Sequence, residues 1–279
     1  MNFRPALPIS GIAGWALLGR TRQAQEETFV SSGEVARDIA YFKDNIANVE
    51  TAEQLVSDRR LLKVALGAFG LSEDLDKKAF VKKVLDEGTE NESAFANRMV
   101  DKKYARLSQT FGFGNIAGRQ TNRSGFAAGI TADFQTRSFE IAVGKENESF
   151  RLAMTFEREI TQIAETASNG NTGWFSILGN LPLRQVAIDS LGLPSSFTSL
   201  SVDQQAETLR SRMAATYGIE GVEDFADQAK RDEVVRGFLA RNPGGPTNFG
   251  SSPASAALTL LSANSTSSPS EAIFAALYG

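Results

Sequence analysis

The sequence predicts an all-α protein: an internally duplicated helical bundle with two related multi-helix halves, an extended N-terminal arm and a flexible C-terminal tail. Apolar residues recur mostly at spacings of three and four, which is the period of an amphipathic helix. In addition, residues 61–71 (LLKVALGAFGL) are similar to residues 183–193 (LRQVAIDSLGL), and what recurs is a set of packing residues. Internal similarity of this kind indicates one packed unit that is used twice.

The chain of 279 residues is expected to divide into four parts. These are an N-terminal arm over residues 1–27, a first helical repeat over 28–126, a second helical repeat over 127–241 and a tail over 242–279. The tail is rich in Gly, Ser, Pro and Asn, so it is predicted to be flexible, with short amphipathic segments inside it.

The arm is expected to be mostly extended, because prolines and glycines break its apolar run. These residues are Pro5, Pro8, Gly11 and Gly14. No small-residue cleavage site follows the run, so the arm does not match a signal peptide. Trp15, Leu17 and Leu18 are apolar enough to dock on another surface.

In the first half, the first predicted helix has apolar residues at spacings of 4, 3, 4 and 3, which places them on one face. These residues are Val35, Ile39, Phe42, Ile46 and Val49. Residues 51–54 (TAEQ) form a capping box that opens a short helix. The first copy of the similar segment follows and ends at Gly70, which is placed as a helix-terminating glycine. Two further helices are expected, from Ser72 to Gly88 and over residues 95–111.

In the second half, residues 126–143 fit a helix or a strand, and a helix is favoured because a lone strand would have no partner. A long apolar stripe follows from Leu152, and then a short helix around Trp174. Asn180 caps the second copy of the similar segment, and Ser201 opens a capping box. The last long helix is expected to begin near Val222.

Composition limits the chemistry that this chain can perform. It has no cysteine and no histidine, which removes thiol nucleophiles and the commonest general base and metal ligand. We expect no catalytic, cofactor-binding or metal-ligating residue. The net charge is −4 with both signs well mixed, so no nucleic-acid partner is expected. No apolar run has the length of a membrane span, so no membrane insertion is expected.

Three groups of residues are candidate sites. The glycines of residues 111–115 (FGFGN) lack the lysine of a phosphate loop and are better explained by helix termination. Glu157 and Glu159 lie two residues apart, do not face each other on a helix, and are expected on a solvated face. Arg59 and Arg60 stand at a helix N-terminus, against its dipole. They indicate a structural salt bridge, to Asp38 or Asp44, or else an anion or partner contact.

Several stretches carry a family resemblance. They are residues 37–71 (RDIAYFKDNIANVETAEQLVSDRRLLKVALGAFGL), 94–104 (AFANRMVDKKY), 111–114 (FGFG) and 133–153 (DFQTRSFEIAVGKENESFRLA). Together they resemble an alphaproteobacterial family catalogued as a domain of unknown function, number 1217. The resemblance spans most of residues 28–241. It implies an all-helical, internally duplicated fold and genes that often lie among flagellar genes, and it provides no catalytic residues.

From these observations we expect a non-catalytic structural or interaction protein with protein partners, associated with the bacterial flagellum. It would be a component, an assembly factor or an export partner. We expect it in the cytoplasm, or exported without a cleaved signal peptide as part of the flagellum. Two alternatives remain. One is a cytoplasmic chaperone or regulator that binds a helix, and the other is a hydrolase of the carboxylate type, which needs two acids in one cleft.

Overall fold

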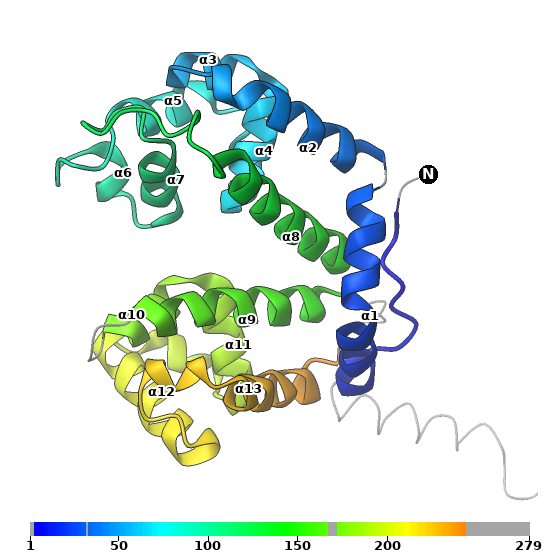
Figure 1. Ribbon diagram of the computed structural model, residues 1–279. Coiled ribbons are helices and arrows are strands. Elements are labelled where there is room, and N and C mark those ends of the chain that lie inside the picture. The colour runs from blue at the N-terminus through cyan, green and yellow to red at the C-terminus, as the bar shows by residue number, and fades with distance from the viewer. Residues whose placement is uncertain (1–2, 32, 167–171, 244–279) are drawn as a thin grey trace, which may run out of the picture. The chain divides into compact units, whose positions relative to one another are not determined.

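A computed structural model describes residues 3–31, 33–166 and 172–243, and every regular element among them is a helix (Figure 1). The α-helices are α1 (Gly11–Ser31), α2 (Gly33–Asn45), α3 (Ala52–Ser57), α4 (Arg59–Phe69), α5 (Lys78–Asp86), α6 (Phe95–Arg98), α7 (Lys103–Phe111), α8 (Phe126–Glu146), α9 (Glu148–Thr166), α10 (Thr172–Gly179), α11 (Leu181–Leu191), α12 (Val202–Tyr217) and α13 (Gln228–Arg241). Short 3-10 helices are η1 (Ile46–Asn48), η2 (Ser72–Asp74), η3 (Ser195–Ser199) and η4 (Val222–Ala226). The predicted all-α class is confirmed, and residues 126–143 are helical as favoured.

The helices surround two hydrophobic cores. The first core is built from α2 to α5, α7 and the beginning of α8, with Phe42, Leu62 and Phe111 fully buried in it. The second core is built from α9 to α13 together with the end of α8 and two residues of α1. Residues 1–244 nevertheless form one compact unit.

Helix α8 connects the two cores. Ile130 and Phe134, in its first half, are buried in the first core, whereas Phe139 and Val143 are buried in the second. The predicted boundary between residues 126 and 127 therefore lies at the start of α8, while the change of core occurs inside the helix. A rigid helix that belongs to both cores links their positions.

The expected extended arm is wrong beyond residue 10, because α1 is a helix of 21 residues. Residues 3–10, which contain both prolines, are not helical and run back along α1 (Figure 1). The Ala6 N–H donates to Gln25 at 2.8 Å, and the ring of Phe3 lies 5.5 Å from that of Phe29. Glycine disfavours an isolated helix, but burial of α1 against the second core outweighs that local cost.

The docking expected of this segment is confirmed. Leu18 is only 2% exposed in the second core, and the ring of Trp15 lies 5.8 Å from that of Phe150 in α9. At Gly14, a Cβ would come within 1.9 Å of the Ile9 carbonyl oxygen, so only glycine allows the chain to turn back on α1 here. Helix α1 also packs against α2, α8 and α13.

Three helices predicted as continuous are interrupted, and the first of them, expected from Ser72 to Gly88, divides into η2 and α5. The other two are interrupted beside an Asp side chain. The helix expected over residues 95–111 divides into α6 and α7, because Met99 is extended and the side chain of Asp101 accepts from the Lys103 N–H. The helix expected from Val222 divides into η4 and α13, where Asp227 acts as a new N-cap. At Asp101 and Asp227 an Asp side chain competes for backbone donors, and a pattern of apolar residues does not reveal this competition.

The N-caps predicted at Asn180 and Ser201 are confirmed, and the capping box predicted at residues 51–54 forms only in part. Asn180 caps α11 and Ser201 forms the full capping box of α12. Thr51 caps α3, although the Gln54 side chain accepts from the Glu50 N–H. Among the described residues, none of the helices combines the length and apolar content that a bilayer crossing requires. The predicted flexible tail lies outside the described residues, except for its first two.

Candidate functional site

The consecutive residues Glu157, Arg158 and Glu159 lie in the middle of α9, between the two sets of helices. Successive residues of a helix point about 100° apart, so these side chains reach different surroundings. Glu157 faces α1 and α13, while Arg158 and Glu159 face α8, and Glu159 also faces the N-terminus of α11. The two glutamates do not face each other, as predicted. The expected solvated face is wrong, because Glu159 is only 4% exposed.

Arg158 and Glu159 belong to a buried ion network between α8 and α9. Glu159 pairs with Arg137 at 3.2 Å and with Arg158 at 3.1 Å. Arg158 also donates to both carboxylate oxygens of Glu140, at 2.8 and 2.9 Å. Such bidentate, charge-assisted pairs are the strong class of hydrogen bond, and they compensate the cost of removing four charges from water.

The network extends to α4 and α11, the helices that contain the two similar segments. Arg137 Nε donates to the carbonyl oxygen of Ala68, near the end of α4, at 2.8 Å. On the other side, the amide of Asn180, the N-cap of α11, donates to Glu159. One continuous series of polar contacts therefore joins helices α4, α8, α9 and α11.

The charges in this network control its ionisation. Burial alone would raise the pKa of Glu159, but Arg158 and Arg137 beside it hold that pKa below its usual value. Burial and the neighbouring Arg158 lower the pKa of Arg137, which Glu159 opposes. The carboxylate of Glu159 therefore stays ionised at neutral pH, and the network acts as a structural link.

Glu157 lies in a different place, in a groove of about 350 Å³ between α1, α9 and α13. Helix α1 contributes an apolar wall, and α13 contributes polar side chains. The lining comprises Ile12, Trp15, Ala16, Leu18, Gly19, Arg22, Glu157, Gln228, Asp232 and Arg236.

The carboxylates of Glu157 and Asp232 are poorly compensated. The nearest cation to Glu157 is Arg22, at 3.9 Å, and Arg22 itself is held by Glu26 at 2.7 Å. Burial raises the pKa of Glu157 to about 7; Arg22 opposes this shift and the negative charge of Asp232 adds to it. Within the described part of the chain, no donor forms a hydrogen bond to either carboxylate.

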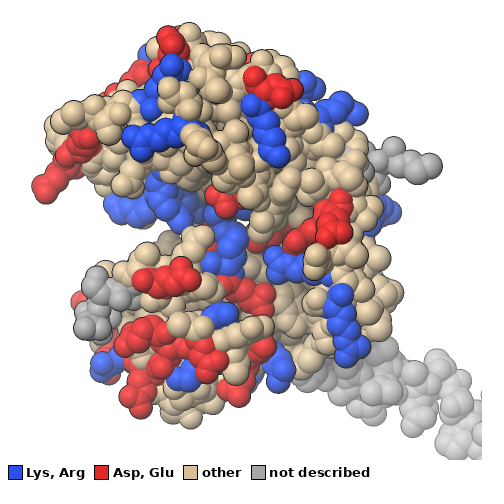
Figure 2. Space-filling model, in the orientation of Figure 1, with Lys and Arg blue, Asp and Glu red and all other residues tan. Residues whose placement is uncertain are grey.

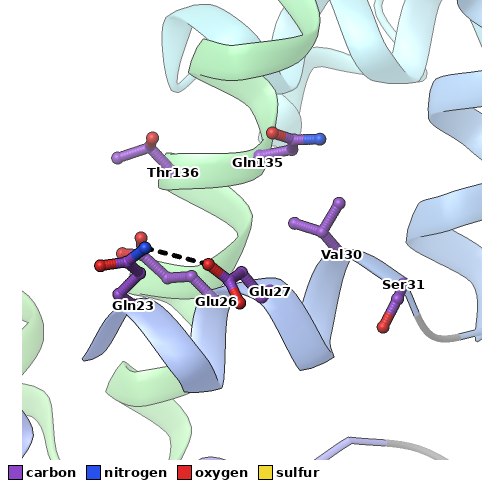
Figure 3. A pocket seen from close by; sticks show the side chains of 7 residues that line it. All are labelled: Gln23, Glu26, Glu27, Val30, Ser31, Gln135 and Thr136. Atoms are coloured by element: carbon purple, nitrogen blue, oxygen red, sulfur yellow. Dashed lines mark hydrogen bonds between the residues drawn. The ribbon is translucent and has the colours of Figure 1, made fainter. Parts of the chain in front are cut away.

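A second hollow, of about 390 Å³, lies on the other side of α1, facing α8 (Figure 3). Gln135 and Thr136 line it from α8, and Glu26 and Glu27 line it from α1. Gln23 donates to Glu27 at 3.0 Å across one turn of α1. Its polar groups are therefore partly satisfied within the helix itself.

The remaining sequence candidates have structural roles. Arg60 pairs with Asp38 at 3.1 Å, which confirms the predicted salt bridge, and Arg59 pairs with Asp76 at 2.5 Å. Gly112 ends α7 in a left-handed conformation, so helix termination explains the FGFGN motif. Among the described residues, no group of three or more His, Cys, Asp or Glu side chains could hold a metal ion.

Charges of both signs share the visible surface. In Figure 2, lysine and arginine side chains gather around the hollow between the helices of the first core and those of the second. Acidic side chains gather over the helices of the second core. Arg106 of α7 donates to Gln162 of α9 at 3.4 Å.

Periodicity on single helices did not identify the partners of Glu157 and Glu159. Arg137 and Glu140 occupy helix α8, about 20 residues earlier, and Asp232 occupies α13. A weak signal existed: Arg137 and Glu140 are three residues apart, which places them on one helix face that also carries Asp133.

A family model described as a protein of unknown function, DUF1217, matches residues 68–230, which is more than half of the chain. The chain belongs to this family. It is similar to the X-ray crystal structure of a structural-genomics protein from Agrobacterium tumefaciens, with a TM-score of 0.68 and 25% identity. That match covers 85% of this chain and 97% of the other. No protein of curated function matches the chain.

Proposed function

We propose that this chain is a non-catalytic structural or interaction protein associated with the bacterial flagellum, as a component, an assembly factor or an export partner. The observation that carries the non-catalytic part is the use of its buried charges. The ion pairs between α8 and α9 engage all four charged side chains of the network, so none of these side chains is available to bind or activate a substrate. They are Arg137, Glu140, Arg158 and Glu159. The flagellar part rests on the gene neighbourhood that the family resemblance implies.

The absence of histidine and cysteine from the whole sequence supports the same proposal. A groove with an apolar wall and poorly compensated carboxylates suits contact with another protein, since protein interfaces combine apolar anchors with charged groups that select the partner. We therefore place the partner-binding surface around α1.

Localisation tests the proposal. Native cells would be fractionated into cytosol, purified hook–basal bodies and medium, with and without a working flagellar export apparatus. We expect the protein in the basal body or medium, and only when export works. Purely cytosolic protein that is unchanged in the export mutant would contradict export and favour the helix-binding chaperone or regulator.

One observation favours a second candidate, a hydrolase of the carboxylate type. Glu157 and Asp232 line the same groove, and a carboxyl group with a pKa of about 7 is suited to act as a general acid. Release of reducing sugars from purified cell-wall glycan by the wild type, lost in both Glu157→Gln and Asp232→Asn, would establish this activity and displace the non-catalytic proposal.

We also propose that the two sets of helices arose by internal duplication. Helices α4 and α11 each have 11 residues, a side-chain N-cap and a left-handed glycine, Gly70 or Gly192, at the C-cap. Helix α4 packs against α2, α3 and α8, and α11 packs against α9, α10 and α13 in the corresponding order. The two halves of the A. tumefaciens structure should therefore superpose on each other; unrelated helix directions there would contradict duplication.

A further inference from the structure

We infer that the groove between α1, α9 and α13 binds a basic side chain, lysine or arginine, presented by the partner protein. This inference rests on the proposed function and specifies the chemistry of the partner. The aliphatic stem of the side chain would lie along the wall formed by Ile12, Trp15 and Ala16. Its cationic head would lie between Glu157 and Asp232.

The first argument is the incomplete compensation of the acids in the groove. Glu157 and Asp232 line it from two helices, and the negative charge of Asp232 disfavours the ionised form of Glu157, an effect that Arg22 and Arg231 oppose. A cation placed between them removes this repulsion and supplies the hydrogen-bond donors that neither carboxylate finds among the described residues. Charge complementarity of this kind selects a partner as well as adding affinity.

The second argument is that the resident arginines do not fill this role. Arg22 is directed to Glu26 at 2.7 Å and reaches Glu157 only at 3.9 Å. Arg236 is exposed, and no hydrogen bond or ion pair joins it to another described side chain. A ligand cation can therefore approach Glu157 more closely than either arginine does.

The third argument is the wall opposite the acids. Trp15 packs on Phe150 but remains partly exposed toward the groove, and Ile12 is 44% exposed. Long basic side chains bury their methylene stems on such surfaces while the charged head stays polar, and the indole face attracts cations. The groove volume of about 350 Å³ accommodates one such side chain.

The test uses the full chain and short peptides. The probes are an acetylated and amidated peptide, Ala-Leu-Lys-Leu-Ala, and a matched peptide with Glu in place of Lys. Binding is followed by the indole N–H resonance of Trp15, assigned with a Trp15→Phe variant; the only other tryptophan, Trp174, is 1% exposed. We expect a saturable shift with the Lys peptide and none with the Glu peptide.

Variants identify the groups responsible. Glu157→Gln and Asp232→Asn keep the shape of each side chain and should each weaken Lys-peptide binding about tenfold, the value of one charge-assisted hydrogen bond. Glu27→Gln, on the other side of α1, is the matched control and should leave binding unchanged. Affinity should rise from pH 6 to pH 8 as Glu157 ionises.

Equal shifts with both peptides, no shift at millimolar peptide, or unchanged binding in the Glu157 and Asp232 variants would overturn the inference. Its failure is distinguishable from failure of the proposed function, because localisation is measured separately. If the protein is found in the basal body but does not bind the Lys peptide, the proposed function is supported and binding of a basic side chain in this groove is contradicted.

Discussion

At the scale of single residues, one tripeptide of α9 holds two glutamates with opposite electrostatics. Glu159 lies between two arginines, so its pKa is held below the usual value. Burial raises the pKa of Glu157 to about 7, because Arg22 and Arg231 offset that effect only in part and the negative charges of Asp232 and Glu140 add to it. Burial affects both side chains in the same direction, and the nearby charges decide the outcome.

The raised pKa of Glu157 predicts a pH-dependent stability. The pKa of this carboxyl group is higher in the folded state than in the unfolded state, so its contribution to stability is fully present below pH 4.5. The free energy of unfolding should then fall by up to about 3 kcal/mol as pH rises through about 7. Because the chain has no histidine, no other side-chain type normally titrates between pH 5 and 8. Glu157→Gln should remove most of this slope and raise stability at pH 8, as measured by urea denaturation. An unchanged slope would contradict this assignment.

Glu159→Gln should have the opposite effect at neutral pH. Removing one charge from a buried network leaves Arg137 without its partner and should cost about 3 kcal/mol or more. Since the pKa of Glu159 is lowered, this contribution exists above pH 4.5 and is lost as pH falls through the folded-state pKa. The difference between wild type and variant should therefore shrink in acid.

The matched control is Glu148→Gln in the same helix. Its side chain is 59% exposed and pairs with Arg151 one turn away, so the change should cost less than about 1 kcal/mol. Equal losses in the two variants would show that burial of the network contributes nothing specific.

At the scale of elements, α1 is held by packing more than by its own sequence. Its three glycines disfavour a free helix. Its position is set by the returning residues 3–10, by Trp15 against Phe150, and by Phe29 against Phe139. The same element lines both hollows beside it, so any change in its docking alters the candidate site.

Two glycine substitutions in α1 separate propensity from packing. Gly14→Ala places a Cβ within 1.9 Å of the Ile9 carbonyl, so it should destabilise the protein by about 2 kcal/mol or more and loosen α1. Gly19→Ala meets nothing within 4 Å and should stabilise by about 0.5 to 1 kcal/mol through helix propensity. Thermal unfolding measures both, and Trp15 fluorescence reports the docking. Equal effects of the two changes would contradict the close contact at Gly14.

At the scale of the whole described chain, two cores share one helix. Phe134 and Phe139 of α8 belong to different cores, and the ion network lies beside the point of change. Unfolding of one core should therefore disturb the other, because α8 cannot lose one half without exposing the polar network to water. We expect one cooperative transition for residues 3–243.

Breaking α8 between the cores tests this coupling. Ser138→Pro removes a helix hydrogen bond and should cost about 3 kcal/mol, whereas Ser138→Ala should be nearly neutral. Trp15 and Trp174 both report on the second core, and far-ultraviolet circular dichroism reports on all helices. The two probes should coincide in the wild type and in Ser138→Ala, and separate in Ser138→Pro. Coincident curves for Ser138→Pro would mean that α8 does not couple the cores.

The sequence by itself determined the helical class, most helix termini and the two similar segments, because helical periodicity, N-caps such as Asn180 and left-handed glycines such as Gly70 act within a few residues. Only the tertiary structure decided that residues 11–31 form a docked helix, that α8 serves two cores, and that Glu157 and Glu159 have different environments. These outcomes depend on groups that are distant in sequence, among them Ala68, Arg137 and Asp232. Burial and Coulomb interactions act through space, so a pattern along one helix cannot reveal which charges will be brought together.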